Sequence, residues 1–172
     1  MSSISTRPAD VPLDELVRAR RIRRFGLAIL GVVVVAGLFN LLGIRREVVV
    51  AEGAGYRLDV RYARVTRPGL ATTWEVAVTH PGGFDGPITI ATNADYFDRF
   101  DFNQFYPEPS TTAARGDVVL LTFEDIEGER FILRFDGRAT PTFAFDPAEA
   151  TTTLEVRGRE VARVDYTTVV MP

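Results

Sequence analysis

The chain has no cysteine, no lysine and a single histidine, His80, among its 172 residues. The absence of cysteine excludes disulfides, thiolate zinc sites, lipoprotein acylation and cysteine nucleophiles. One histidine is too few for the usual zinc and copper ligand sets. A Ser–His pair would need Ser110, which is the one serine after residue 5, follows a proline and lies outside any G-x-S-x-G elbow. The sequence therefore predicts no enzyme activity and no cofactor.

The charges are unevenly distributed along the chain. Residues 1–46 carry eight arginines and three acids, a balance of +5, whereas residues 47–172 carry twelve arginines and twenty acids, a balance of −8. Binding to phosphates needs a basic surface that displaces counterions, so the acidic portion is poorly suited to nucleic acid. We expect no nucleic-acid partner.

One long apolar run, FGLAILGVVVVAGLFNLLGI at 25–44, contains twenty residues and no charge. A helix of that length spans roughly 30 Å, the hydrocarbon thickness of a bilayer. Five arginines lie between residues 18 and 24 and two directly follow the run, so the N-terminus is expected in the cytoplasm. A cleavable signal peptide fits less well, because the possible VVA site at 49–51 lies too far beyond the run.

The predicted organisation follows from this run. Residues 1–24 form a cytoplasmic arginine-rich tail, 25–44 an uncleaved transmembrane signal anchor, 45–55 a linker and first strand, and 56–172 an extracytoplasmic domain. The expected localisation is the cell membrane, crossed once.

Apolar residues recur at every second position in YRLDVRYARV (56–65) and TTWEVAVTH (72–80). This alternation is typical of strands with one buried and one wet face. Further strand candidates are 87–92, 117–124, 129–135, 151–157 and 160–170. Turn sequences separate these segments, and Trp74 lies at the centre of an early one. The pattern predicts an all-β, antiparallel, immunoglobulin-like β-sandwich of about seven to nine strands.

Two short motifs carry a resemblance to a group of proteins. YPEP at 106–109 lies between two predicted strands, and the chain ends in an aromatic strand followed by MP at 171–172. In these features the chain resembles small single-pass bacterial membrane proteins with an extracytoplasmic immunoglobulin-like domain. The resemblance implies a fold and a location, and it implies no catalytic activity.

The segment DYFDRFDFNQFYPEPS (95–110) packs six aromatic rings and four carboxylates into sixteen positions. Three aspartates recur every three residues, so a helical turn capped by Asn93 would place them on one side and three rings on the other. The aspartates are Asp95, Asp98 and Asp101, and the rings are Tyr96, Phe97 and Phe100. Because a catalytic carboxylate pair needs partial burial, water-facing aspartates disfavour glycosidase-like chemistry.

The second half of this segment is held extended by Pro107 and Pro109. Two interpretations of its rings remain open: a plug that fills the end of the sandwich, or an exposed aromatic shelf for a glycan, peptide or lipid. The same choice applies to the rings of TPTFAFDP (140–147). The candidate binding residues are Phe102, Phe105, Tyr106, Phe143 and Phe145.

A weak calcium candidate lies in EDIEGE, where four acids surround Gly128. They are Glu124, Asp125, Glu127 and Glu129. Acids at a hairpin tip also keep the turn wet and block edge pairing, and no D-x-D-x-D-G spacing is present. The favoured expectation is therefore that the chain has no metal site.

Two functions fit these patterns. The first is a non-enzymatic, membrane-anchored interaction or scaffold module for another envelope component, with the bilayer bound through 25–44 and a multipass membrane protein as the expected partner. The alternative is a ligand-binding module that uses the aromatic loops 96–106 and 143–145 for an envelope carbohydrate or lipid. Exposure of the five candidate rings discriminates between them.

Overall fold

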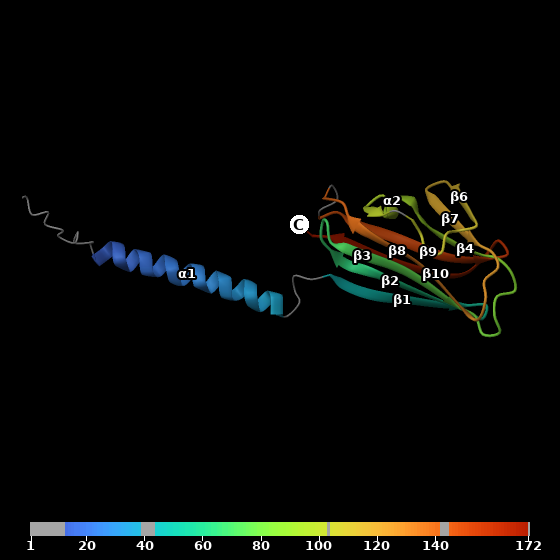
Figure 1. The fold of residues 1–172 in the computed structure, drawn as a ribbon, viewed down its shortest axis with the longest axis horizontal. Helices are drawn as coiled ribbons and strands as arrows, with labels where there is room; N and C mark the ends of the chain where they lie inside the picture. Colours follow the sequence, from blue (N-terminus) through green and yellow to red (C-terminus); the bar gives the residue numbers. More distant parts are fainter. Residues whose placement is uncertain (1–12, 39–43, 103, 142–144, 172) are drawn as a thin grey trace, which may run out of the picture. The chain divides into compact units, whose positions relative to one another are not determined.

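The computed structural model describes residues 13–38, 44–102, 104–141 and 145–171, and the chain divides into two units at residues 43 and 44 (Figure 1). In the first unit, helix α1 (Leu13–Leu38) covers most of the apolar run, and residues 39–43 of that run lie outside the described residues. Helix formers such as leucine, glutamate and arginine between residues 13 and 24 extend it before the run. Within the ranges given above, no helix is long and apolar enough to cross a membrane.

In the described part of the second unit, ten strands join in one sheet. They are β1 (Arg45–Gly53), β2 (Tyr56–Thr66), β3 (Ala71–Thr79), β4 (Ile88–Asn93), β5 (Phe100–Phe102), β6 (Thr111–Arg115), β7 (Val118–Phe123), β8 (Arg130–Ala139), β9 (Pro147–Val156) and β10 (Arg159–Val170). Their order is β5-β8-β3-β2-β10-β9-β4-β7-β6, and β1 pairs with β2 outside this path.

The pairings are antiparallel except where the end of β10 meets the end of β2. There Val169 and Val170 lie parallel to Val65 and Thr66. The sheet is therefore mixed, and the prediction of a purely antiparallel arrangement is wrong at this pairing. Each of the seven strand segments expected from alternation and turn chemistry overlaps an observed strand, so the prediction of a mostly β domain is confirmed.

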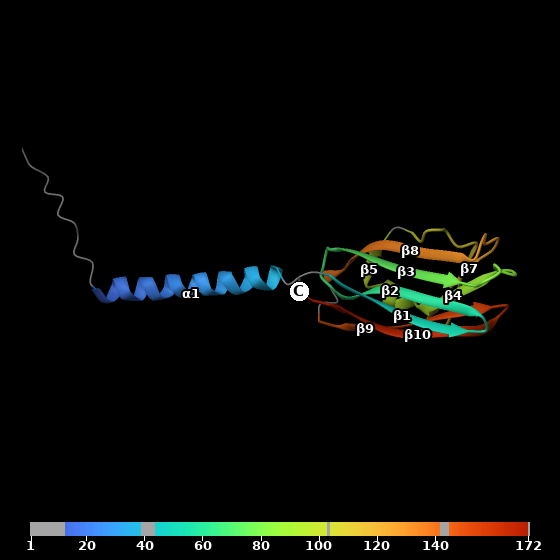
Figure 2. The same cartoon turned by 90° about the horizontal axis from the view of Figure 1, so that it is seen from below.

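The sheet curls so that β3 and β8 lie on one side of the core and β9 and β10 on the other (Figure 2). One hydrogen bond crosses the core between these two sides: the Trp74 Nε1–H of β3 donates to the Tyr166 hydroxyl of β10 at 2.8 Å. Burial alternates residue by residue along the whole of β8, as period-two patterning requires. Trp74 is 1% exposed and stands at the centre of this core.

The Trp74–Tyr166 hydrogen bond is part of a buried network of hydroxyl groups. The Tyr166 hydroxyl also bonds Thr152 at 3.0 Å, and Thr152 bonds Thr92 at 3.0 Å. The Tyr96 hydroxyl pairs with Thr168 at 3.2 Å. Among the described residues, no buried side-chain nitrogen or oxygen lacks a hydrogen-bond partner. The core is thus polar in places but fully paired, which avoids the cost of unsatisfied groups.

These buried tyrosines predict a loss of stability in alkali. Burial raises the pKa of Tyr96 and of Tyr166, so the folded chain holds both protons at pH values where an unfolded tyrosine, with a pKa of about 10, loses them. Their contribution is complete below about pH 10 and is lost as the pH rises above that value. The chain has no lysine, and arginine stays charged, so few other groups titrate in this window.

The measurement is the urea midpoint of the full chain in detergent as a function of pH. We expect a constant midpoint between about pH 7 and 9 and a decline above about pH 10. Tyr166→Phe should reduce the slope of that decline. A midpoint that stays constant well above pH 10 would contradict the burial of these hydroxyls.

Candidate functional site

The helical turn in the aromatic segment forms as predicted. Helix α2 (Ala94–Phe97) buries Tyr96 and Phe97, and Phe100 follows them into the core. Asp95 of α2 and Asp98, which directly follows it, are exposed, so the amphipathic turn is confirmed for these two aspartates. Asp101 is also exposed, but it lies with Phe100 in strand β5, so the prediction that the helical turn extends to these two residues is wrong. The predicted cap is wrong. Asn93 makes no side-chain cap hydrogen bond, because its Oδ1 accepts the Thr151 N–H at 2.7 Å and so ties α2 to β9.

Of the candidate rings, some fill the core as a plug and others are exposed, as a binding shelf would require. Phe102 and Phe105 are half-buried and pack on the core, with ring centroids 4.5 Å apart for Phe102–Phe135 and 6.5 Å apart for Phe105–Trp74. These two therefore act as a plug. Tyr106 is 64% exposed and Phe145 is 74% exposed. Phe143 lies outside the described residues.

Tyr106 lies on the edge of β8 and is held there by its backbone. Its N–H donates to the Arg134 carbonyl at 2.8 Å, and the Arg134 N–H donates to the Tyr106 carbonyl at 2.9 Å. The guanidinium carbon of Arg134 lies 5.6 Å from the centre of the Tyr106 ring, within range of a cation–π contact. The backbone pairing thus fixes which side chains stand beside each other on the surface.

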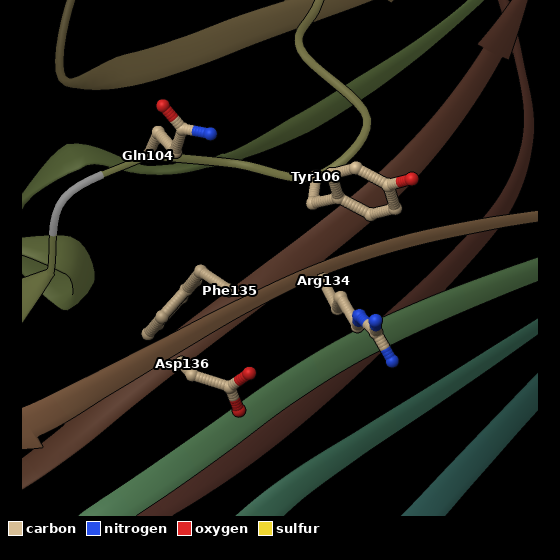
Figure 3. A pocket seen from close by; sticks show the side chains of 5 residues that line it. All are labelled: Gln104, Tyr106, Arg134, Phe135 and Asp136. Carbon is tan, nitrogen blue, oxygen red and sulfur yellow. The ribbon is translucent and has the colours of Figure 1, made fainter.

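A shallow hollow of about 310 Å³ surrounds this pair (Figure 3). Gln104, Tyr106, Arg134, Phe135 and Asp136 line it. Asp136 accepts the Thr73 hydroxyl at 2.5 Å, so its carboxylate is oriented by the neighbouring strand β3. We call the polar and aromatic residues of this hollow, Gln104, Tyr106, Arg134 and Asp136, the Tyr106 surface.

The edge of β8 continues unpaired beside the Tyr106 surface. Because the N–H and C=O of Arg134 point toward Tyr106, those of Ile132, two residues earlier, point to the same edge. Within the part of the sheet that the structure describes, Ile132 pairs only with Ala77 of β3, on the opposite side. An open strand edge with an exposed isoleucine thus adjoins an exposed tyrosine and arginine.

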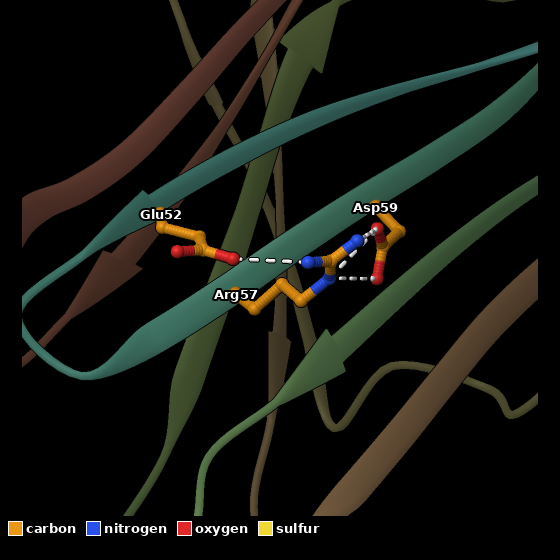
Figure 4. A network of polar contacts seen from close by, with 3 residues as sticks. All are labelled: Glu52, Arg57 and Asp59. Carbon is orange, nitrogen blue, oxygen red and sulfur yellow. Dashed lines mark hydrogen bonds and ion pairs between the residues drawn. The ribbon is translucent and has the colours of Figure 1, made fainter.

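A second polar cluster, on the hairpin of β1 and β2, joins one arginine to two acids and so keeps a net charge of −1 (Figure 4). The Arg57 guanidinium bonds Glu52 at 2.9 Å and both oxygens of Asp59 at 3.1 Å. Arg57 and Glu52 are largely exposed, so solvent screens this ion pair and it contributes little to stability. This cluster is a solvated face and is not a candidate site.

The remaining candidates are held in local turns. His80 stacks on Tyr56 with ring centroids 4.0 Å apart, and its Nδ1 bonds the Gly83 carbonyl. The Ser110 hydroxyl accepts the Glu124 N–H at 3.2 Å. Ser110 and His80 both lie in the part of the chain that the structure describes, and there they form no hydrogen bond with each other.

The four acids of the 124–129 turn are exposed. Over the described ranges, no three histidine, aspartate or glutamate side chains are grouped so that they could hold a metal ion. The Glu129 carboxylate accepts the Gly82 N–H at 2.8 Å and so joins the β7–β8 turn to the β3–β4 loop. The weak calcium candidate, Glu124, Asp125, Glu127 and Glu129, is therefore not supported by the geometry.

Together these features define a mostly β protein with a curled, mixed sheet. The chain matches no protein family in a scan of family descriptions and no curated protein. Among solved structures it is similar to the N-terminal domain of the Streptococcus gordonii adhesin Sgo0707, at 13% identity and a TM-score of 0.48. The match covers 69% of this chain and 33% of that chain, so it spans about a third of the adhesin structure.

Proposed function

We propose that the protein is a non-enzymatic, membrane-anchored, extracytoplasmic interaction module. Its β domain, which we take to be an immunoglobulin-like sandwich, would bind or scaffold another envelope component, and a multipass membrane protein is the partner class we favour. Tethering both partners in one membrane raises their effective concentration, so a small contact surface is sufficient.

The proposed anchor is supported by the apolar run at 25–44 and by the side chains of α1. Large apolar side chains from Phe25 to Val35 are each at least half exposed within the first unit. A helix that is apolar on every side is removed from water most simply by a bilayer. The arginines before the run support a cytoplasmic N-terminus.

The observation that carries the proposed interaction is the Tyr106 surface on the open edge of β8. Tyrosine and arginine are the residue types that most often dominate binding energy at protein interfaces. An open edge also offers backbone N–H and C=O groups to an added strand. We therefore place the partner against Tyr106 and Arg134, with a strand of the partner alongside Ile132.

Site-specific photo-crosslinking in native membranes tests this proposal. With Tyr106→benzoylphenylalanine in the full chain, we expect a discrete adduct, and a further Arg134→Ala change should lower its yield about tenfold. The matched control is Arg159→benzoylphenylalanine, at an exposed position of β10, which should give no such adduct. Equal adducts from both positions, or none from either, would overturn the proposed surface.

A second candidate function is favoured by the exposure of Tyr106 and Phe145. Exposed rings can stack on a carbohydrate or insert into lipid, as a ligand-binding module would require. It is weaker than the first candidate, because Phe102 and Phe105 join the core and leave no continuous shelf. Binding of envelope glycan fragments to the purified full chain, lost in Tyr106→Ala, would favour it over the interaction module.

A further inference from the structure

Three loops meet at the end of the sheet where the chain enters the second unit. Strand β1 begins at Arg45, which pairs with Val65 at the end of β2. Backbone hydrogen bonds then join the loops: Gly69 N–H to the Ala139 carbonyl, Met171 N–H to the Thr66 carbonyl, and Phe145 N–H to the Val170 carbonyl. We call this end, formed by Arg45, 66–70, 139–141, 145–146 and 170–171, the proximal end.

Each of these loops exposes one large apolar side chain. Leu70 is 40% exposed, Met171 is 41% exposed and Phe145 is 74% exposed. Single exposed apolar residues are common, but these three lie at one end of the sheet, on segments that are hydrogen-bonded to one another, and we call them the apolar patch.

The backbone of Phe145 is a second, independent observation. Its φ of 65° lies in the left-handed region, which bulky residues rarely adopt because of its steric strain. The strained conformation accompanies a ring that lies in water, so burial of the ring within the β domain does not offset the cost. Strain of this kind is concentrated at binding sites, where a ligand or partner uses the projected side chain.

Basic residues border the patch. Arg45 and Arg46 are exposed at the start of β1, and Arg67 is half-exposed in the loop before Leu70. Of the acids nearby, Asp146 is held by Arg99 at 2.9 Å and Glu47 by Arg64 at 2.7 Å. Asp98, next to Arg99, is exposed and contributes one opposing charge. The proximal end therefore combines an apolar patch with a net basic border.

We propose that the proximal end docks on the surface of the lipid bilayer. Leu70, Phe145 and Met171 insert among the headgroups, and Arg45, Arg46 and Arg67 contact anionic headgroups. This inference rests on the proposed membrane anchor. The apolar run ends at Ile44 and β1 begins at the next residue, so an anchored chain has no spacer between the bilayer and the proximal end. The bilayer is accordingly the occupant we infer, in preference to a second copy or another protein.

The absence of cysteine allows a direct test with single-cysteine labels. Met171→Cys of the full chain carries an environment-sensitive fluorophore, and the purified protein is reconstituted in vesicles of phosphatidylcholine with about 30% phosphatidylglycerol. The vesicles contain lipids with a nitroxide at the headgroup. We expect quenching several-fold stronger than for the control label Glu127→Cys, which lies on the exposed β7–β8 turn. Combining Met171→Cys with Leu70→Ser and Phe145→Ser should reduce quenching to the control level.

The outcomes separate this inference from the anchor on which it rests. If the chain leaves the vesicles at alkaline extraction, the anchor itself is wrong. If the chain stays with the vesicles but Met171→Cys is quenched no more than Glu127→Cys, docking is overturned while the anchor stands. Efficient crosslinking of two Met171→Cys chains by a short bismaleimide, without quenching, would assign the patch to a second copy and also overturn it.

Discussion

Trp74→Ala should lower the free energy of unfolding of the β domain by about 3–5 kcal/mol, the range seen for large aromatic residues truncated in a core. The indole is 1% exposed, and its ring centroid lies 5.6 Å from that of Phe135 and 5.4 Å from that of Phe97. Truncation removes these contacts and leaves a cavity between the two sides of the curled sheet. It also removes the donor to the Tyr166 hydroxyl, which keeps only its bond to Thr152.

Urea unfolding of the full chain, followed by circular dichroism, measures this loss. Trp74→Phe is the matched control: it keeps an aromatic ring in the core but lacks the N–H, so we expect a smaller loss, about 1–3 kcal/mol. Equal losses for the two variants would show that the hydrogen bond, rather than the packing, dominates. A loss below about 1 kcal/mol for Trp74→Ala would contradict the central position of this residue.

Among the glycines that the structure describes, Gly53 is the one where a change to alanine is expected to be most damaging. A Cβ at Gly53 would lie 1.9 Å from the carbonyl oxygen of Val161 and 3.1 Å from its carbonyl carbon. Both are backbone atoms of β10, so no side-chain rotation can relieve the clash, and β1 or β10 must move. Overpacking of this kind costs about 1–3 kcal/mol and more where the backbone is rigid, so we expect about 3 kcal/mol.

Gly69→Ala is the matched control for this prediction. Gly69 has a φ of 76° and no atom within 4 Å of an added Cβ, so alanine there pays only the conformational cost of about 1 kcal/mol. Hydrogen exchange should locate the damage, because Gly53→Ala is expected to expose the amides of β1 and leave those of β3 and β8 protected. Equal destabilisation by the two alanines would show that β1 does not pack against β10.

The alternation of apolar and polar residues predicted the strands that have one buried and one exposed face. It did not predict the strands that lack such a pair of faces. All five residues of β6 are exposed, so its sequence TTAAR carries no alternation to find. Strand β5 has three residues, in a segment whose ring spacing also suits a helical turn. The parallel pairing of β10 with β2 joins residues far apart in the chain, and local patterns contain no information about such contacts.

Long-range contacts, which local sequence patterns do not contain, also decide which of the candidate rings are buried. Phe105 and Tyr106 are adjacent in an extended segment, so one must point to the core and the other to water. Which one does so is set by the register of Tyr106 against Arg134, a contact across 28 residues (134 − 106). The sequence left open whether these rings fill the core or stay exposed, and it could not predict that Phe105 would be half-buried and Tyr106 exposed. The role of Asn93 was missed similarly, because its acceptor bond reaches Thr151 on a distant strand.

The parallel pairing of β10 with β2 also affects how the β domain folds. Val65 and Val169 are separated by 104 residues (169 − 65), and the link between the two halves of the sheet depends on this pairing. Closing so long a loop is costly before the contact forms, so folding should be slow and should finish with the docking of β10. A growing chain that has not yet exposed Val169 has no complete sheet. During synthesis the domain would therefore remain open and susceptible to proteases and chaperones until β10 is in place.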